Sequence, residues 1–299
     1  MQSGQMQRPR PAAHPKELPP CRGPKLQAFR HHNSPIEWLG RIDAGSDSPL
    51  GDSDSGRQGY VFKVRIESEL YALKVFKFYN AEDTRWSWEA YVSGKDPKRL
   101  AELHLDPFYA ECRAYGRINM AKSQGKTKRD IAIPCYGFIY LDDCYRKQLD
   151  EYGVDLDENC LDSDSSTNSS PTPGARRPIT SRPIRGIIKK LASSDPGITY
   201  KIIENIRKDI QELNRLKVYN TDIRRDNFCD GKLVDFGSSI TEPHCLITPE
   251  NGFLSKQSQY GDMGMLEDVV EKAGILVRWR TSENLEYKKK LRSTSVRNR

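Results

Sequence analysis

The sequence predicts an α+β fold of two lobes, in which an antiparallel sheet is followed by a mainly helical, truncated C-terminal lobe. Residues 60–66 and 70–78 are rich in apolar residues and flank a short polar turn, which is typical of a β-hairpin. Farther along the chain, apolar residues recur every three or four positions at Ile202, Ile206, Ile210, Leu213 and Leu216. This spacing predicts an amphipathic helix.

The first lobe is expected over about residues 34–191. Its five antiparallel strands are predicted at 36–42, 60–66, 70–78, 131–141 and 184–191. One helix is expected in this lobe, at about 107–120. Its start is predicted because Asp106 suits the N-cap and Pro107 suits the first helical position.

The second lobe is expected over about residues 192–280. Asp195-Pro196 repeats the capping pattern and predicts the start of the helix that carries the apolar stripe. Asp230-Gly231 predicts a two-residue hairpin turn. A last helix is expected at 262–279, where apolar residues again recur at helical spacing.

Three segments are predicted to be disordered: 1–33, 144–182 and 281–299. Residues 1–33 carry six Lys/Arg and one acid, and residues 276–299 carry eight Lys/Arg and two acids. Such basic tails are usually solvated, but they also suit weak contact with DNA or an acidic partner. The inserted segment has seven acids and no basic residue over 150–164, and a Ser/Thr/Asn/Pro-rich stretch follows.

Cysteine and histidine spacing gives no motif for a disulfide framework or a zinc site. The seven cysteines form no C-x-x-C pair, and the five histidines lack metal-ligand spacing. No apolar run near the N-terminus indicates a secretory signal, and none approaches the ~18 residues of a membrane span. We therefore expect a soluble protein of a reducing compartment, with no membrane partner.

The order of the charged motifs resembles that of a protein kinase over about residues 36–280. Ala72-Leu73-Lys74 lies in a strand, Glu111 lies early in the next helix, and an amphipathic helix leads to Asp222 and Asn227. A short hairpin then ends in Asp235-Phe236-Gly237. Together these motifs imply a protein-kinase-like fold that binds ATP and Mg²⁺.

The phosphate-binding part would combine a glycine loop with an ion pair. Gly56, Gly59 and Val61 fit the end of the kinase glycine-rich motif, and a plain Gly-rich hairpin loop is the alternative. Lys74 would bind the nucleotide phosphates while pairing with Glu111. The alternatives are a solvated strand lysine and a glutamate that only complements the helix dipole.

The resemblance assigns the remaining chemistry to four residues. Asp222 would orient the acceptor hydroxyl and take its proton, while Arg224, where kinases place a lysine, would neutralise charge on the transferred phosphoryl group. Asn227 and Asp235 would hold Mg²⁺. The alternative is a charged turn before an unrelated hairpin.

Two departures from the kinase pattern bear on activity. Asn220-Thr221 replaces the His-Arg that precedes the catalytic aspartate, and only 62 residues follow Gly237. Thr248-Pro249-Glu250 resembles the A-P-E element only weakly. The sequence therefore favours nucleotide binding over efficient phosphorylation of protein substrates.

A closer resemblance is to a fungal protein-kinase-like family typified by a subunit of the kinetochore Sim4 complex. It rests on the segments at 36–40, 59–64, 71–79 and 106–117. The resemblance implies a kinase-like fold, protein partners such as kinetochore subunits, and the nucleus in preference to the cytoplasm.

Three functions remain open from the sequence. The first is a divergent kinase or pseudokinase that binds Mg-ATP and acts through protein partners. The second is an active atypical phosphotransferase on a protein or small molecule. The third is a chromatin-associated adaptor without nucleotide binding.

Overall fold

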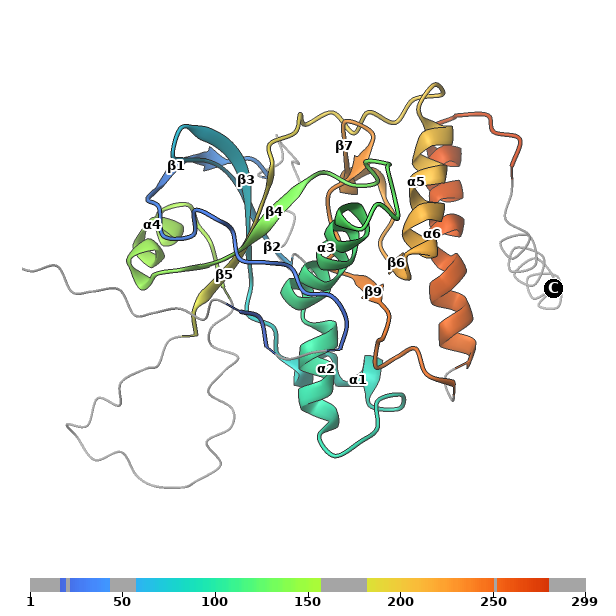
Figure 1. Cartoon of the computed structure of the whole chain (residues 1–299), viewed down its shortest axis with the longest axis horizontal. Helices are drawn as coiled ribbons and strands as arrows, with labels where there is room; N and C mark the ends of the chain where they lie inside the picture. The colour runs from blue at the N-terminus through green and yellow to red at the C-terminus, as the bar shows by residue number, and fades with distance from the viewer. Residues whose placement is uncertain (1–16, 20–21, 44–57, 157–181, 250–251, 280–299) are drawn as a thin grey trace, which may run out of the picture.

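A five-stranded antiparallel sheet forms one side of the molecule in the computed structural model, which describes residues 17–19, 22–43, 58–156, 182–249 and 252–279 (Figure 1). The strands are β1 Ile36–Arg41, β2 Gly59–Ile66, β3 Glu69–Phe76, β4 Cys135–Leu141 and β5 Ile184–Lys190. Their order is β1-β2-β3-β5-β4, and every neighbouring pair is antiparallel. The prediction of five antiparallel strands is confirmed, although β4 begins four residues later than expected.

One face of the sheet is covered by a segment that the sequence analysis assigned to disorder. Residues Asp143–Tyr145 form a 3-10 turn, η2, and Arg146–Glu151 form helix α4. Leu149, Val154 and Leu156 are buried in the cluster that contains the sheet residues Trp38 and Phe62. The prediction of disorder is therefore wrong for residues 144–156, because these apolar side chains were overlooked among the acids. Residues 157–181 lie outside the described residues.

The N-terminal segment also packs on the sheet. Leu18, Leu26 and Phe29 are buried, and the backbone N–H of Phe29 donates to the carbonyl of Phe138 at 2.8 Å. Gly137 has a φ of 146° and leaves no room for a Cβ, which would lie 2.6 Å from the Phe29 nitrogen. The prediction of a disordered tail is thus wrong for residues 17–19 and 22–33. Residues 1–16 and 280–299 are not described.

Helix α3, Pro107–Ser123, joins the sheet to the rest of the molecule (Figure 1). Its predicted cap is confirmed, since the Asp106 side chain accepts from the Phe108 N–H at 3.0 Å. The shorter elements before it are the 3-10 turn η1 Ala81–Thr84, α1 Arg85–Trp88 and α2 Pro97–Leu105. Buried residues of α3 belong to the same apolar cluster as residues of β5 and of the C-terminal helices.

Two helices lie side by side in the C-terminal part, α5 Ile203–Arg215 and α6 Gly252–Lys272 (Figure 1). Along the chain, two short antiparallel ladders separate α5 from α6. The first pairs β6 Val218–Asn220 with β9 Ser239–Thr241, and the second pairs β7 Phe228–Cys229 with β8 Lys232–Leu233. The 3-10 turn η4 Arg225–Asn227 lies between β6 and β7. The predicted Asp-Gly turn is confirmed, with positive φ at Asp230 and Gly231.

Both C-terminal helices differ from the predicted bounds. Helix α5 has Ile202 as its N-cap and begins seven residues after Pro196. Asp195 instead accepts from the Gly197 N–H, and its carbonyl accepts from the Asp230 N–H. Asp195-Pro196 therefore does not cap a helix, and Asp195 instead holds the Asp230-Gly231 turn through its backbone carbonyl. Helix α6 begins ten residues before the predicted Asp262. No helix in the described part of the chain is long and apolar enough to cross a bilayer.

Candidate functional site

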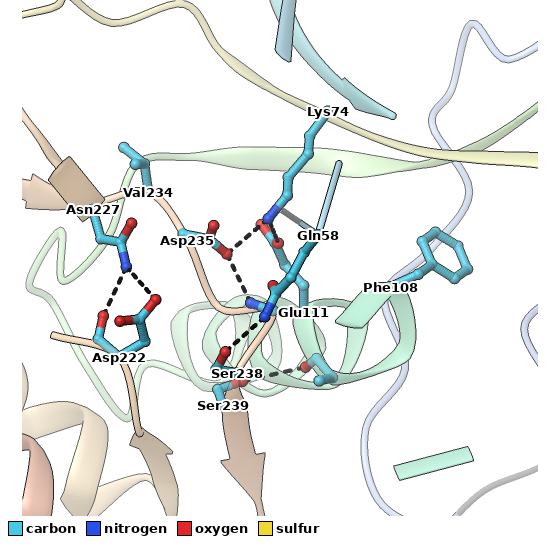
Figure 2. A network of polar contacts seen from close by, with 12 residues as sticks. Gln58, Lys74, Phe108, Glu111, Asp222, Asn227, Val234, Asp235, Ser238 and Ser239 are labelled. Carbon is cyan, nitrogen blue, oxygen red and sulfur yellow. Dashed lines mark hydrogen bonds and ion pairs between the residues drawn. The ribbon is translucent and has the colours of Figure 1, made fainter. Parts of the chain in front are cut away.

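Lys74 lies at the centre of the candidate site, on the middle strand of the sheet. It pairs with Val61 of β2 and Ile187 of β5, and its side chain is buried. Its Nζ lies 2.9 Å from Glu111 Oε2 and 2.7 Å from Asp235 Oδ1 (Figure 2). The structure therefore brings together three predicted residues from β3, α3 and the segment after β8.

A second lysine that the sequence analysis missed completes this cluster. Lys189 of β5 contacts Glu111 Oε1, and its Nζ donates to the carbonyl of Val234 at 2.6 Å. Its ammonium also lies 5.5 Å from the ring centroid of Tyr115. The available signal was a lysine directly after two isoleucines in a strand that was expected to be apolar. Such a buried cation requires a carboxylate partner.

The formal charges of the cluster, which consists of Lys74, Lys189, Glu111 and Asp235, sum to zero. Burial alone would lower the pKa of Lys74, but Asp235 and Glu111 together raise it above its ordinary value. Burial would raise the pKa of Asp235, and Lys74 and Lys189 outweigh this and hold it well below its usual range. Lys74 and Asp235 are therefore ionised at neutral pH, and the site is held by charge pairing in a largely water-free place.

Asp235 keeps one carboxylate oxygen available. Its Oδ1 accepts from Lys74 and from the Gly237 N–H at 2.8 Å, whereas Oδ2 has no hydrogen bond among the described residues. The Asp235 side chain is 30% exposed, in contrast to fully buried Glu111. The next residue, Phe236, is buried with its ring centroid 5.1 Å from that of Tyr115, which fixes the direction of the turn.

Asp222 and Asn227 form a second group on the loop between β6 and β7. The Asn227 Nδ2 donates to the Asp222 carbonyl at 2.7 Å and to its Oδ2 at 3.0 Å. Figure 2 shows the Asn227 amide oxygen on the side away from Asp222. Arg224 is exposed, and its Nε lies 3.5 Å from Asp222 Oδ2. The structure thus joins three further predicted residues.

Asn220, noted above only as a departure from the kinase pattern, links the two groups. Its Nδ2 donates to the Asp235 carbonyl at 2.8 Å, and its Oδ1 accepts from the Asp222 N–H at 3.0 Å. A neutral amide therefore connects the two segments that carry the predicted chemistry.

Asp262 of α6 lies close to Asn220 and is buried. Its Oδ1 accepts from the Asn214 amide at 3.1 Å, its Oδ2 is buried without a hydrogen-bond partner in the described part of the chain, and the nearby backbone N–H of Asn220 acts to lower the pKa of its carboxyl group. Burial raises the Asp262 pKa to about 7, and these hydrogen bonds only partly oppose the rise. No sequence pattern predicted this role, because a polar residue at the start of an apolar stripe is usually solvated.

The glycine loop is only partly described. Gly56 lies outside the described residues, while Gly59 begins β2. A Cβ at Gly59 would lie 2.3 Å from the Val75 carbonyl oxygen, so close strand packing is sufficient to explain this glycine. Val61 lies opposite Lys74 in the ladder. Gln58 donates from Nε2 to Ser238 Oγ at 2.8 Å, and so links the start of β2 to the turn after Asp235 (Figure 2).

A surface hollow elsewhere is a weaker candidate. It has a volume of about 420 Å³ and is lined by Arg129, Asp130, Ile202, Asn205, Asp209 and Lys232. The buried Asp209 already pairs with both cations, at 2.6 Å from Arg129 and 2.7 Å from Lys232. We interpret this network as a structural link between α5 and the β7–β8 hairpin.

The family model described as kinetochore Sim4 complex subunit FTA2 matches residues 14–240. No curated protein matches the chain. A solved structure of vaccinia related kinase 3 is similar with a TM-score of 0.34 and 9% identity, covering 74% of this chain. The match covers 53% of that kinase chain, so this chain spans about half of its length.

Proposed function

The chain belongs to the family of the kinetochore Sim4 complex subunit FTA2, and on that premise we propose that it is a two-lobed protein-kinase-like subunit that binds Mg-ATP. The single observation that supports this most strongly is the contact of Lys74 with both Glu111 and Asp235. Phosphoryl-transfer folds use such a lysine for phosphate charge, and a helix carboxylate keeps it in position.

The donor set suits Mg²⁺, which prefers oxygen ligands in octahedral geometry. Asp235 Oδ2 has no hydrogen bond among the described residues, and the amide of Asn227 uses its nitrogen on Asp222. The Asp235 carboxylate and the Asn227 amide oxygen would therefore hold the ion. Bound Mg²⁺ would supply charge neutralisation for the nucleotide phosphates.

The chain's own residues would position the nucleotide. Lys74 would exchange its contact with Asp235 for a phosphate oxygen and retain Glu111, which Lys189 also neutralises. The contact of Gln58 with Ser238 lies beside the turn after Asp235, so this contact would have to break before the phosphates enter.

Phosphotransfer to a protein or small molecule is the second candidate function, and Asp222 is the observation that favours it. Its carboxylate is partly exposed and is oriented by Asn227 at 3.0 Å, so it is available to an acceptor hydroxyl. Arg224 would place positive charge beside the acceptor. Protein partners at the kinetochore, and hence a nuclear location, are proposed from membership in a family of complex subunits.

Isothermal titration calorimetry with Mg-ATP tests the proposal. We expect saturable binding by the wild-type chain, strongly weakened binding by Asp235→Asn and Lys74→Met, and nearly unchanged binding by Asp222→Asn, because that residue faces the acceptor. Lys190→Met, an exposed lysine next to Lys189, is the matched control. Each variant is first shown to be folded by circular dichroism.

No binding by the folded wild-type chain would refute the nucleotide site and leave the adaptor function. Binding combined with transfer of the γ-phosphoryl group, lost in Asp222→Asn, would establish the phosphotransferase.

A further inference from the structure

Two histidines and a cysteine that are distant in the sequence lie close together in the fold. His104 lies in the last turn of α2, while His244 and Cys245 lie in the segment after β9. The elements α2 and β9 are labelled in Figure 1. One ligand atom from each lies within 4.8 Å of the others. The three residues are 9%, 5% and 9% exposed, so the group lies just beneath the surface. Sequence spacing excluded such a site because His104 and His244 are 140 residues apart.

The polar atoms of this group are incompletely satisfied. His104 Nδ1 is buried and has no hydrogen-bond partner among the described residues. His244 Nε2 lies 3.4 Å from the His104 carbonyl oxygen, a long contact, and the two rings meet edge to face at 4.8 Å. Because a buried imidazole nitrogen normally has a partner, the unpaired nitrogen requires an explanation.

We propose that His104, His244 and Cys245 bind Zn²⁺. Two imidazoles and a thiolate are donors that zinc prefers. Tetrahedral zinc with ordinary Zn–N and Zn–S bonds separates its ligands by about 3.3–3.6 Å, so shifts of about 1 Å would complete the site. No fourth protein ligand belongs to the group within the described residues, and water would fill that position.

Burial favours the ligating form of the two histidines but disfavours that of the cysteine. Burial lowers the pKa of His104 to about 3 and that of His244 well below its usual range, so both rings are neutral at pH 7. Burial raises the pKa of Cys245 to about 12, although Arg113 and the N–H groups of Cys245 and Leu246 oppose the rise. Zinc would displace the thiol proton to solvent.

Ligation through Nε2 of His244 would make its Nδ1 a donor. The Leu246 N–H now donates to Nδ1 at 3.2 Å, so ligation through Nε2 would break both this bond and the contact with the His104 carbonyl, whereas ligation through Nδ1 would break only the Leu246 bond. Arg113 donates to the Pro243 carbonyl at 2.8 Å and to the Leu103 carbonyl at 3.4 Å, so its positive charge is fixed near the group. This charge favours the thiolate and opposes the cation. The site would tie α2 to the segment after β9.

The test uses the full chain. Zinc content is measured by mass spectrometry after purification without chelator, and Co²⁺ is then titrated into the metal-stripped protein. We expect one metal per chain and a thiolate-to-cobalt charge-transfer band. Cys245→Ser should abolish the band, and His104→Ala should weaken Co²⁺ binding by more than about tenfold.

The matched controls are Cys144→Ser, at an exposed cysteine, and Cys229→Ser, at a half-buried one. Both should retain the band. If Cys245→Ser does not fold, the proposal is tested by the charge-transfer band of the wild-type chain and by the Co²⁺ affinity of His104→Ala. A folded wild-type chain with no stoichiometric zinc and no charge-transfer band would overturn the proposal, as would a band that survives in folded Cys245→Ser.

Discussion

Replacing Lys189 with methionine tests the charge balance of the buried cluster. The change keeps an unbranched side chain in β5 but removes the cation that contacts Glu111 Oε1 and the Val234 carbonyl. Glu111 is fully buried and would retain only Lys74, at 2.9 Å from its other oxygen. The three remaining charged groups, Lys74, Glu111 and Asp235, would then carry a net charge of −1.

Removing one partner of a buried ion pair typically costs 3–5 kcal/mol. Because Lys74 still neutralises part of Glu111, we expect Lys189→Met to lower the free energy of unfolding by about 3 kcal/mol. Glu111→Gln alone would leave two lysines facing Asp235 and should cost a similar amount. The double variant leaves Lys74 paired with Asp235, so its cost should be roughly 2 kcal/mol, far below the sum of the single changes.

Urea unfolding monitored by circular dichroism measures these three values, with Lys190→Met as the control. Lys190 is exposed on the same strand, so its replacement should change stability by less than about 0.5 kcal/mol. A cost below about 1 kcal/mol for Lys189→Met, or strict additivity in the double variant, would refute the argument that Lys189 balances Glu111.

Three further predictions concern pH, the contact of Gln58 with Ser238 and the tails. Burial holds the pKa of Asp262 at about 7, above its ordinary value of 3.8. The folded state therefore binds the Asp262 proton more tightly than the unfolded state, and the free energy of unfolding should fall by roughly 4 kcal/mol as pH rises from about 4 to 7. Asp262→Asn should flatten this slope in urea titrations, and an unchanged slope would contradict the assignment. Gln58→Ala removes the bond to Ser238 and should speed nucleotide association in stopped-flow measurements, whereas an unchanged or slower rate would exclude this contact as a barrier. Deleting 1–16 and 281–299, which spares the buried Leu18 and Phe29, should reduce the salt dependence of DNA binding, and an identical slope would remove the tails as contacts.

Sequence patterns predicted the elements that depend on local chemistry. The Asp106-Pro107 cap, the Asp230-Gly231 turn and the strand that carries Lys74 follow from residue type and spacing over a few positions, and all three appear in the structure. The pairing of Lys74 with Glu111 was also predicted, from the resemblance of the motif order to that of protein kinases.

The missed features depend on contacts between distant segments. Composition suggested disorder for 22–33 because the segment is polar, yet Phe29 is buried against the β4 backbone. The role of Lys189 was not predicted because its partner, Glu111, lies on helix α3, far from Lys189 in the sequence. The meeting of His104 with His244 is set by the packing of α2 on the segment after β9, which no spacing rule within a single motif describes.

The most direct test of nucleotide binding is the melting temperature of the wild-type chain with and without Mg-ATP. Ligand at a hundredfold excess over Kd stabilises the folded state by about 2.7 kcal/mol. For a chain of 299 residues this should raise the melting temperature by several degrees, since each kcal/mol is worth about 2–4 °C in domains only slightly smaller. The rise should disappear largely when EDTA removes Mg²⁺ and in Asp235→Asn, but persist in Asp222→Asn. An unchanged melting temperature at millimolar Mg-ATP would contradict the proposed nucleotide site.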